Sequence, residues 1–156
     1  MQGLRDKVRN ILKSVDIKSA PISVEKVAEF FSIKIVPYGG FPENISGTIV
    51  EQRGHIVIGV NQNHAQVRQR FTIAHELGHY LCNHDLSEKV IDDVFDKPTD
   101  KEREANMFAA ELLIPYDFIK EDIRTIKAIP ELAKHYHVSE QSISIRLLET
   151  GLIHKI

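Results

Sequence analysis

The feature that most restricts how this chain can fold is a pair of histidines four residues apart, His75 and His79. In a helix, residues at this spacing project from one face about one turn apart. Two imidazole nitrogens placed in this way can bind one metal ion at ~2.0–2.1 Å each. The flanking residues 71–74 and 80–81 are mostly apolar, as a buried helix requires. The pattern therefore predicts a buried helix over about residues 64–83, with a metal site on one face.

Glu76 adds a proton acceptor beside this pair. Residues 75–79 read His-Glu-Leu-Gly-His, which is the HExxH arrangement of zinc-dependent hydrolases. In such sites the glutamate takes a proton from the attacking water. The alternative is an amphipathic helix whose histidines are merely hydrogen-bonded, but polar residues on a buried apolar helix are costly unless something pairs with them. We therefore interpret His75 and His79 as metal ligands and Glu76 as the catalytic residue.

The composition is that of one ordinary globular domain. The chain has 156 residues, 42% hydrophobic and 27% charged, which is enough apolar sequence for a core. A formal net charge of −2 gives no electrostatic reason to expect binding to nucleic acid or to an anionic membrane. No apolar run approaches the ~20 residues that span a bilayer, and the first residues lack the apolar stretch of a signal peptide. Because Cys82 is the only cysteine, no internal disulfide can form, and a cytoplasmic location is expected.

Hydrophobic periodicity divides the rest of the chain into helices and a few strands. The predicted strands are residues 33–36, 46–50 and 55–60. The predicted helices besides the motif helix are residues 3–15, 24–31, 101–113, 116–127, 131–137 and 140–150. The sequence Gln52-Arg53-Gly54 is typical of a hairpin turn, so the last two strands are expected to be antiparallel neighbours. Residues 85–100 are polar and are predicted to form a loop.

These elements predict an α+β fold. It is expected to hold a small, mostly antiparallel three-stranded sheet, packed on the HExxH helix and on a second helix that supplies a ligand. Residues 1–115 are expected to form this core, and residues 116–156 a helical C-terminal extension packed on it.

A catalytic zinc usually has three protein ligands and one open position, so another ligand must come from elsewhere in the chain. In metzincins it is a histidine six residues after the second histidine of the motif, with a glycine between. Here Asp85 takes the histidine's place and Cys82 the glycine's, while His84 is one residue out of register. The short spacing therefore does not fit. Cys82 shares the face of His75 and His79, so a ligand or redox role stays open for it beside that of a small buried residue.

A glutamate on the helix predicted at residues 101–113 is the better source of the third ligand. The apolar face of that helix consists of Ala105, Phe108, Ala109, Leu112 and Leu113. Glu102 lies in line with this face, whereas Glu104 and Glu111 lie together on its flank and are expected to share the same exposure. A carboxylate on a buried face is the one most in need of a cation, so we choose Glu102 and keep Glu104 as second choice. The alternative is that Glu102 only stabilises the first helical turn through the dipole.

Three nearby polar residues have less specific expectations. Tyr80 rotates away from the histidine face and is given no role. His84 is expected to interact with the dipole at the end of the motif helix. Asn106, one turn beyond Glu102, is expected either to hold that carboxylate or to bond to the backbone.

Two long motifs resemble the ImmA/IrrE family of bacterial metallo-endopeptidases. The first is RFTIAHELGH at residues 70–79, and the second is EREANMFAAELLIP at residues 102–115. The resemblance extends over about residues 20–153. It implies a zincin-like metallopeptidase core with a helical, helix-turn-helix-like tail, and it places the third metal ligand on Glu102.

The resemblance also implies a function. Relatives cleave helix-turn-helix repressors of mobile elements or stress regulons and so switch on the genes that those repressors hold down. The expected cofactor is one divalent metal ion, zinc by preference for a set of two histidines and a glutamate, with manganese or iron as alternatives. The expected partner is a helix-turn-helix repressor, with no direct nucleic acid and no membrane.

Two other functions stay open at this point. A metal-binding protein that sequesters its repressor without cleaving it would need the same residues. A DNA-binding regulator is suggested by the helix-turn-helix outline of residues 131–150, in which Arg146 is expected to be exposed. The charge of residues 131–156 speaks against DNA binding, because three bases are matched by three acids.

Overall fold

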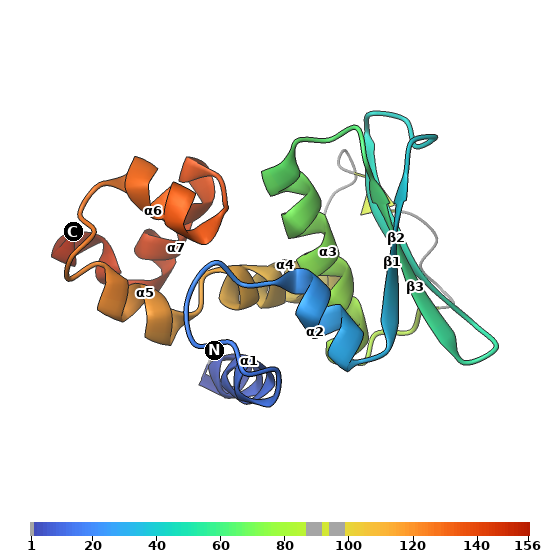
Figure 1. Ribbon diagram of the computed structural model, residues 1–156, viewed down its shortest axis with the longest axis horizontal. Helices are drawn as coiled ribbons and strands as arrows, with labels where there is room; N and C mark the ends of the chain where they lie inside the picture. The colour runs from blue at the N-terminus through green and yellow to red at the C-terminus, as the bar shows by residue number, and fades with distance from the viewer. Residues whose placement is uncertain (1, 87–91, 94–98) are drawn as a thin grey trace. The chain divides into compact units, whose positions relative to one another are not determined.

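The computed structural model describes residues 2–86, 92–93 and 99–156, and its elements follow the predicted order (Figure 1). The helices are α1 (Gln2–Ser14), α2 (Val24–Phe30), α3 (Gln66–Leu81), α4 (Asp100–Leu113), α5 (Tyr116–Asp122), α6 (Ile129–Tyr136), α7 (Glu140–Thr150) and the short 3-10 helix η1 (Leu152–Lys155). The strands are β1 (Ile33–Tyr38), β2 (Ile45–Gln52), β3 (His55–Asn61) and β4 (Asp92–Asp93). The predicted α+β class is confirmed.

Contacts along the backbone divide the chain into two compact units. One unit, Val24–Ala109, contains the sheet, α2, α3 and most of α4. The other unit joins Met1–Ser23 to Ala110–Ile156 and contains α1, α5, α6 and α7. The first helix thus groups with the C-terminal helices, and the boundary expected at residue 115 stays a prediction.

The sheet has the strand order β1-β3-β2-β4 and is mixed. β2 and β3 are antiparallel, as predicted, and the two residues that join them, Arg53 and Gly54, both have positive φ angles, of 54° and 80°. This backbone conformation matches the twist of the strands, and glycine adopts it readily. β1 pairs in parallel with β3, with Ile33 opposite Ile56. The two-residue β4, which pairs with β2, lies inside the segment predicted as a loop; so short a strand has no periodicity to detect.

The core of the first unit lies between the sheet and α3 (Figure 1). Alternate residues of β2 and β3, among them the fully buried Ile49 and Ile58, lie in this core. α3 contributes Ala74 and Leu77, both fully buried. Gly47 lets the helix lie close to the sheet, because a Cβ atom at this position would lie 2.7 Å from Cγ2 of Thr72. The buried face of α3 therefore carries core residues and the motif histidines together.

A second close approach, between α3 and α4, depends on Gly78. A Cβ atom at residue 78 would lie 3.0 Å from the carbonyl oxygen of Ala105 and 3.2 Å from Cβ of Phe108. These separations are shorter than ordinary van der Waals contact. The glycine inside the HExxH motif therefore lets α4 pass directly against the motif helix.

The second unit is held by a buried ion pair that the sequence did not indicate. Arg146 is only 2% exposed; its guanidinium donates to Glu111 Oε1 at 2.5 Å and to the carbonyl oxygen of Ile114 at 2.8 Å. The other carboxylate oxygen of Glu111 accepts from the backbone N–H of Tyr116 at 2.8 Å. The expectations that Arg146 is exposed and that Glu111 shares the exposure of Glu104 were therefore wrong, because each charge is buried against the other.

Within the described ranges, none of the helices combines the length and the apolar character needed to cross a bilayer.

Candidate metal centre

The two motif histidines lie side by side on the buried face of α3. His75 is 7% exposed and His79 is 1% exposed. Their Nε2 atoms are 3.1 Å apart, and the rings meet edge to face with centroids separated by 4.7 Å. The helical spacing predicted from the sequence thus brings two imidazole nitrogens to one point.

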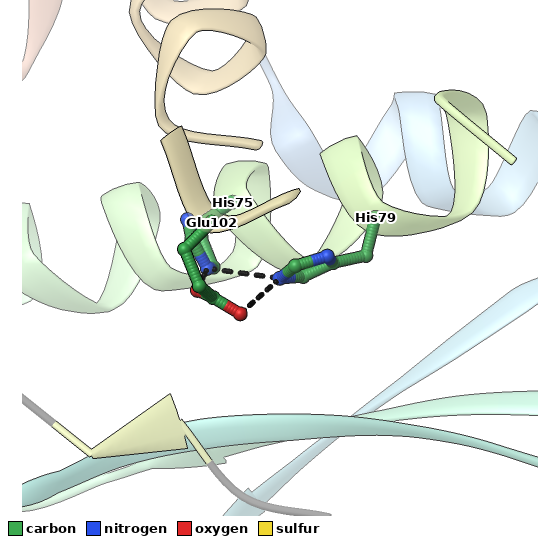
Figure 2. A group of neighbouring side chains, drawn as sticks. All are labelled: His75, His79 and Glu102. Atoms are coloured by element: carbon green, nitrogen blue, oxygen red, sulfur yellow. Dashed lines mark hydrogen bonds and ion pairs between the residues drawn. The ribbon is translucent and has the colours of Figure 1, made fainter. Parts of the chain in front are cut away.

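Glu102 of α4 completes a group of three at the same point (Figure 2). Its Oε2 atom is 2.8 Å from Nε2 of His75, and its Oε1 atom is 3.0 Å from Nε2 of His79. Ligands at ~2.0–2.1 Å from a tetrahedral zinc lie ~3.3 Å from one another, so these three groups need little movement to bind one ion. The donor set of two imidazoles and a carboxylate also suits zinc. The residues present therefore fit a divalent metal.

The carboxylate of Glu102 is held in its charged form. Burial raises its pKa, but hydrogen bonds from His75 and His79 and their positive charge outweigh that effect, so the pKa lies well below its ordinary value. Surroundings that favour the ionised form of Glu102 over its protonated form also favour a bound cation.

The far nitrogens of the two histidines are anchored by different residues. His75 donates from Nδ1 to Oδ1 of Asn106 at 2.7 Å. The Nδ1 atom of His79 is 2.8 Å from Nδ1 of His84, whose Nε2 atom lies 2.5 Å from Oε1 of Glu104. Asn106 therefore contacts a histidine where a contact with Glu102 or the backbone was expected, and His84 contacts side chains where an interaction with the helix dipole was expected.

Glu76 is on α3 between the two histidines and is fully buried. This place is the one that the motif gives to a general base, and the catalytic role of Glu76 stays a prediction. Tyr80, which was given no role, packs edge-on against Phe31 with centroids 6.3 Å apart.

The other candidates for the third ligand do not join the group. Among the residues that the structure describes, His75, His79 and Glu102 are the one set that could hold a metal ion. Glu104 contacts His84 instead, and Cys82 is partly exposed at the end of α3. The face argument for Glu102 thus agrees with the geometry, and its role as a ligand stays a prediction.

Comparison with known proteins identifies the family of this fold and site. The family model of the IrrE N-terminal-like domain matches residues 28–148, which is most of the chain. The chain belongs to the IrrE N-terminal-like family. The resemblance to ImmA/IrrE proteins seen in the two motifs is thereby confirmed, and both helices that carry the candidate site lie inside the matched range.

Two individual proteins illustrate the relationship. The chain is 34% identical over 105 residues to the radiation response metalloprotease IrrE of Deinococcus radiodurans, and this match covers 61% of the chain and 31% of the relative. The chain thus spans about a third of that protein's length. A solved transcriptional regulator of Mycobacterium tuberculosis is similar in fold, with a TM-score of 0.68 and 16% identity over 94% of this chain and 46% of the regulator.

Proposed function

We propose that this protein is a zinc-dependent endopeptidase that cleaves a helix-turn-helix repressor and thereby relieves repression of a mobile-element or stress regulon. The observation that carries the proposal is the convergence of His75, His79 and Glu102 from two helices, with Glu76 beside them. Membership of the family and the likeness to a metalloprotease support the same reaction. The proposed location is the cytoplasm, where such repressors act.

Each residue of the site has a distinct part in the proposed reaction. His75, His79 and Glu102 would hold the metal, which when bound supplies a Lewis acid that polarises the scissile carbonyl and lowers the pKa of water. Glu76 accepts the proton of the attacking water and then gives it to the leaving amine. Burial of Glu76 places this proton transfer away from bulk water.

The two rival functions differ from this one in what they require. A protein that only sequesters its repressor needs the metal ligands and the fold, and has no use for a general base. A DNA-binding regulator needs exposed basic residues on its recognition helix, whereas the arginine of α7, Arg146, is buried in an ion pair with Glu111. The exposed side of α7 includes the apolar residues Ile145 and Leu148, which favours contact with a protein over contact with phosphates.

The substitution Glu76→Gln tests the proposal. Cells that express the wild type are compared with cells that express the variant by mass spectrometry of newly formed N-termini, and metal content is measured by elemental mass spectrometry. We expect a new N-terminus in a helix-turn-helix repressor with the wild type alone, and one equivalent of metal in both proteins. Cleavage by the variant, or relief of repression by the variant without cleavage, would show that the peptidase assignment is wrong.

A further inference from the structure

A chain of two hydrogen bonds connects the buried ligand His79 to a carboxylate at the surface. His79 Nδ1 and His84 Nδ1 are 2.8 Å apart, and His84 Nε2 is 2.5 Å from Glu104 Oε1. The side chain of His84 is 8% exposed and that of Glu104 is 56% exposed. The chain therefore runs outward from the candidate metal centre through a buried imidazole.

The backbone fixes the place of His84. Asn83 has a positive φ of 60°, and the N–H of His84 donates to the carbonyl oxygen of His79 at 2.9 Å. This left-handed residue turns the chain back at the end of α3, a conformation that asparagine tolerates. The imidazole of His84 is thus returned to the side of the helix on which His79 lies.

When His84 is neutral, the hydrogen bonds of this chain have one direction. A carboxylate only accepts, so the Nε2 atom of a neutral His84 must carry the hydrogen that it donates to Glu104. The Nδ1 atom of His84 then has a lone pair and accepts from Nδ1–H of His79. This leaves the lone pair of His79 on Nε2, the nitrogen that faces Glu102.

His75 also has its lone pair on Nε2, and a single hydrogen bond to Asn106 is enough to place it there. The amide oxygen of Asn106 accepts from Nδ1–H of His75, which leaves the lone pair of His75 on Nε2. When a metal displaces the hydrogens that they otherwise donate to Glu102, both imidazoles thus present an unprotonated nitrogen to the site. An imidazole without such a partner can carry its hydrogen on Nε2, where it would block a metal.

We propose that His84 and Glu104 are positioning residues for the metal ligand His79, which fix its tautomer and ring orientation and raise its basicity through the carboxylate. The inference rests on the proposed function, since it takes His79 as a ligand. It assigns Glu104 a part in metal affinity without direct coordination.

Zinc affinity measured by competition with a chromophoric chelator tests this assignment. His84→Ala is expected to weaken zinc binding about 10–100-fold and Glu104→Ala about tenfold, the range seen when residues behind a ligand are removed. The double variant should bind no more weakly than His84→Ala, because the two residues act in series. His84→Asn should recover most of the affinity, since its side-chain oxygen lies near the position of Nδ1 and can accept from His79.

Asp100→Ala is the matched control, because it removes a carboxylate from α4 one turn before Glu104, and that carboxylate pairs with Arg103 and not with His84. Its zinc affinity should stay within about twofold of the wild type. The visible absorption of the cobalt-loaded protein gives a second readout: its bands should shift in His84→Ala and return in His84→Asn. Thermal unfolding of the metal-free variants verifies that each one is folded.

The outcomes separate this inference from the proposed function. If the wild type binds one zinc and His84→Ala binds it equally well, or if His84→Asn is as weak as His84→Ala, the positioning role is wrong and the metal centre stands. If Asp100→Ala weakens binding as much as Glu104→Ala, the effect is general charge and the chain of hydrogen bonds has no part in it. If the wild type binds no metal, both proposals are wrong.

Discussion

At the scale of single residues, the candidate centre balances charge only when a cation is present. Two neutral imidazoles, the form that binds a metal, carry one negative charge together with the carboxylate of Glu102. Without a metal, hydrogen bonds from His75 and His79 and their positive charge keep that carboxylate ionised. The Nε2 atom of His75 lies 2.8 Å from Oε2 of Glu102 and 3.1 Å from Nε2 of His79. A divalent ion would satisfy all three groups at once, which is why this cluster fits a metal better than a purely structural hydrogen-bond network.

Removal of the Glu102 carboxylate tests its role as third ligand. We expect Glu102→Ala to lower zinc affinity by roughly a hundredfold or more, because one of three protein ligands and the charge of the site are lost together. The measurement is the metal content after dialysis against a weak chelator, with Asp100→Ala as the control from the same helical turn. Retention of one equivalent of metal by Glu102→Ala would show that another residue completes the site.

Sequence periodicity could predict the three candidate ligands, but not the position of His84 behind them. His75, His79 and Glu102 follow from helical geometry, because each lies within a helix and its face can be counted. His84 lies beyond the end of α3, and its position depends on the left-handed backbone of Asn83. No periodic pattern contains such a turn, so the contact between His84 and Glu104 could not be predicted.

Tyr136 gives the stability of the protein a dependence on alkaline pH. Burial and a hydrogen bond to Asp122 at 2.6 Å raise the pKa of Tyr136 above its ordinary value. The folded state therefore keeps the proton, while the unfolded chain loses it above about pH 10. The contribution of Tyr136 to the free energy of unfolding is therefore fully present below about pH 10. Above that pH, the free energy of unfolding should fall by about 1.4 kcal/mol per pH unit.

The substitution Tyr136→Phe is expected to remove this slope and to lower the free energy of unfolding at pH 7 by about 1 kcal/mol, the value of one hydrogen bond. Urea unfolding from pH 7 to pH 11 measures both effects. Tyr38→Phe, at a side chain that is 52% exposed, should follow the wild-type curve. An unchanged slope in Tyr136→Phe would assign the alkaline sensitivity to other groups.

At the scale of elements, the site depends on how closely α4 approaches α3. Glu102 reaches the histidines because Gly78 leaves room for the backbone of Ala105. The periodicity of α4 alone predicts that Glu102 lies on a buried face, but it does not give the separation between α3 and α4. The parallel pairing of β1 with β3 was missed for a related reason, since periodicity identifies strands and does not state which strands are neighbours.

Gly78→Ala tests the importance of this approach. Alanine in a helix interior is favoured over glycine by ~1 kcal/mol, but overpacking at 3.0–3.2 Å opposes it by about 1–3 kcal/mol. We expect a net loss of about 1 kcal/mol in the free energy of unfolding of the metal-free protein. Zinc affinity should fall about tenfold, because α4 and Glu102 must shift by a few tenths of an ångström.

Gly3→Ala is the matched control, since a Cβ atom in that helical position would meet nothing within 4 Å. Its stability should equal or slightly exceed that of the wild type, and its zinc affinity should not change. Urea unfolding and chelator competition measure the two quantities. If Gly78→Ala binds zinc as tightly as Gly3→Ala, the close packing of α3 and α4 does not set the geometry of the site.

At the scale of the whole molecule, contacts between distant parts of the chain determine which helices group together and which charges are buried. A pattern along the chain does not show either. Arg9 of α1 donates to Asp117 of α5 at 2.7 Å, across 108 residues of sequence. α1 corresponds to the helix predicted at residues 3–15, and its residues Val8, Ile11 and Leu12 are buried. Nothing in that pattern indicated that these residues would group with Ala110–Ile156. The ion pair of Glu111 with Arg146 was missed for the same reason, because the sequence pattern around each charge does not show its distant partner.

Metal binding should stabilise the whole protein, because the three proposed ligands come together only in the folded chain. His75 and Glu102 are 27 residues apart in sequence, so the unfolded chain offers no comparable site. A ligand at a thousand times its dissociation constant stabilises the folded state by ~4.1 kcal/mol. For a protein of this size, each kcal/mol shifts Tm by ~2–4 °C, so removal of zinc should lower Tm by about 8–16 °C. Differential scanning calorimetry with and without a strong chelator measures the shift, and Glu102→Ala should show almost none. A chelator effect of equal size in the wild type and in Glu102→Ala would mean that the stabilising metal lies elsewhere, and then the catalytic assignment of this cluster would fail with it.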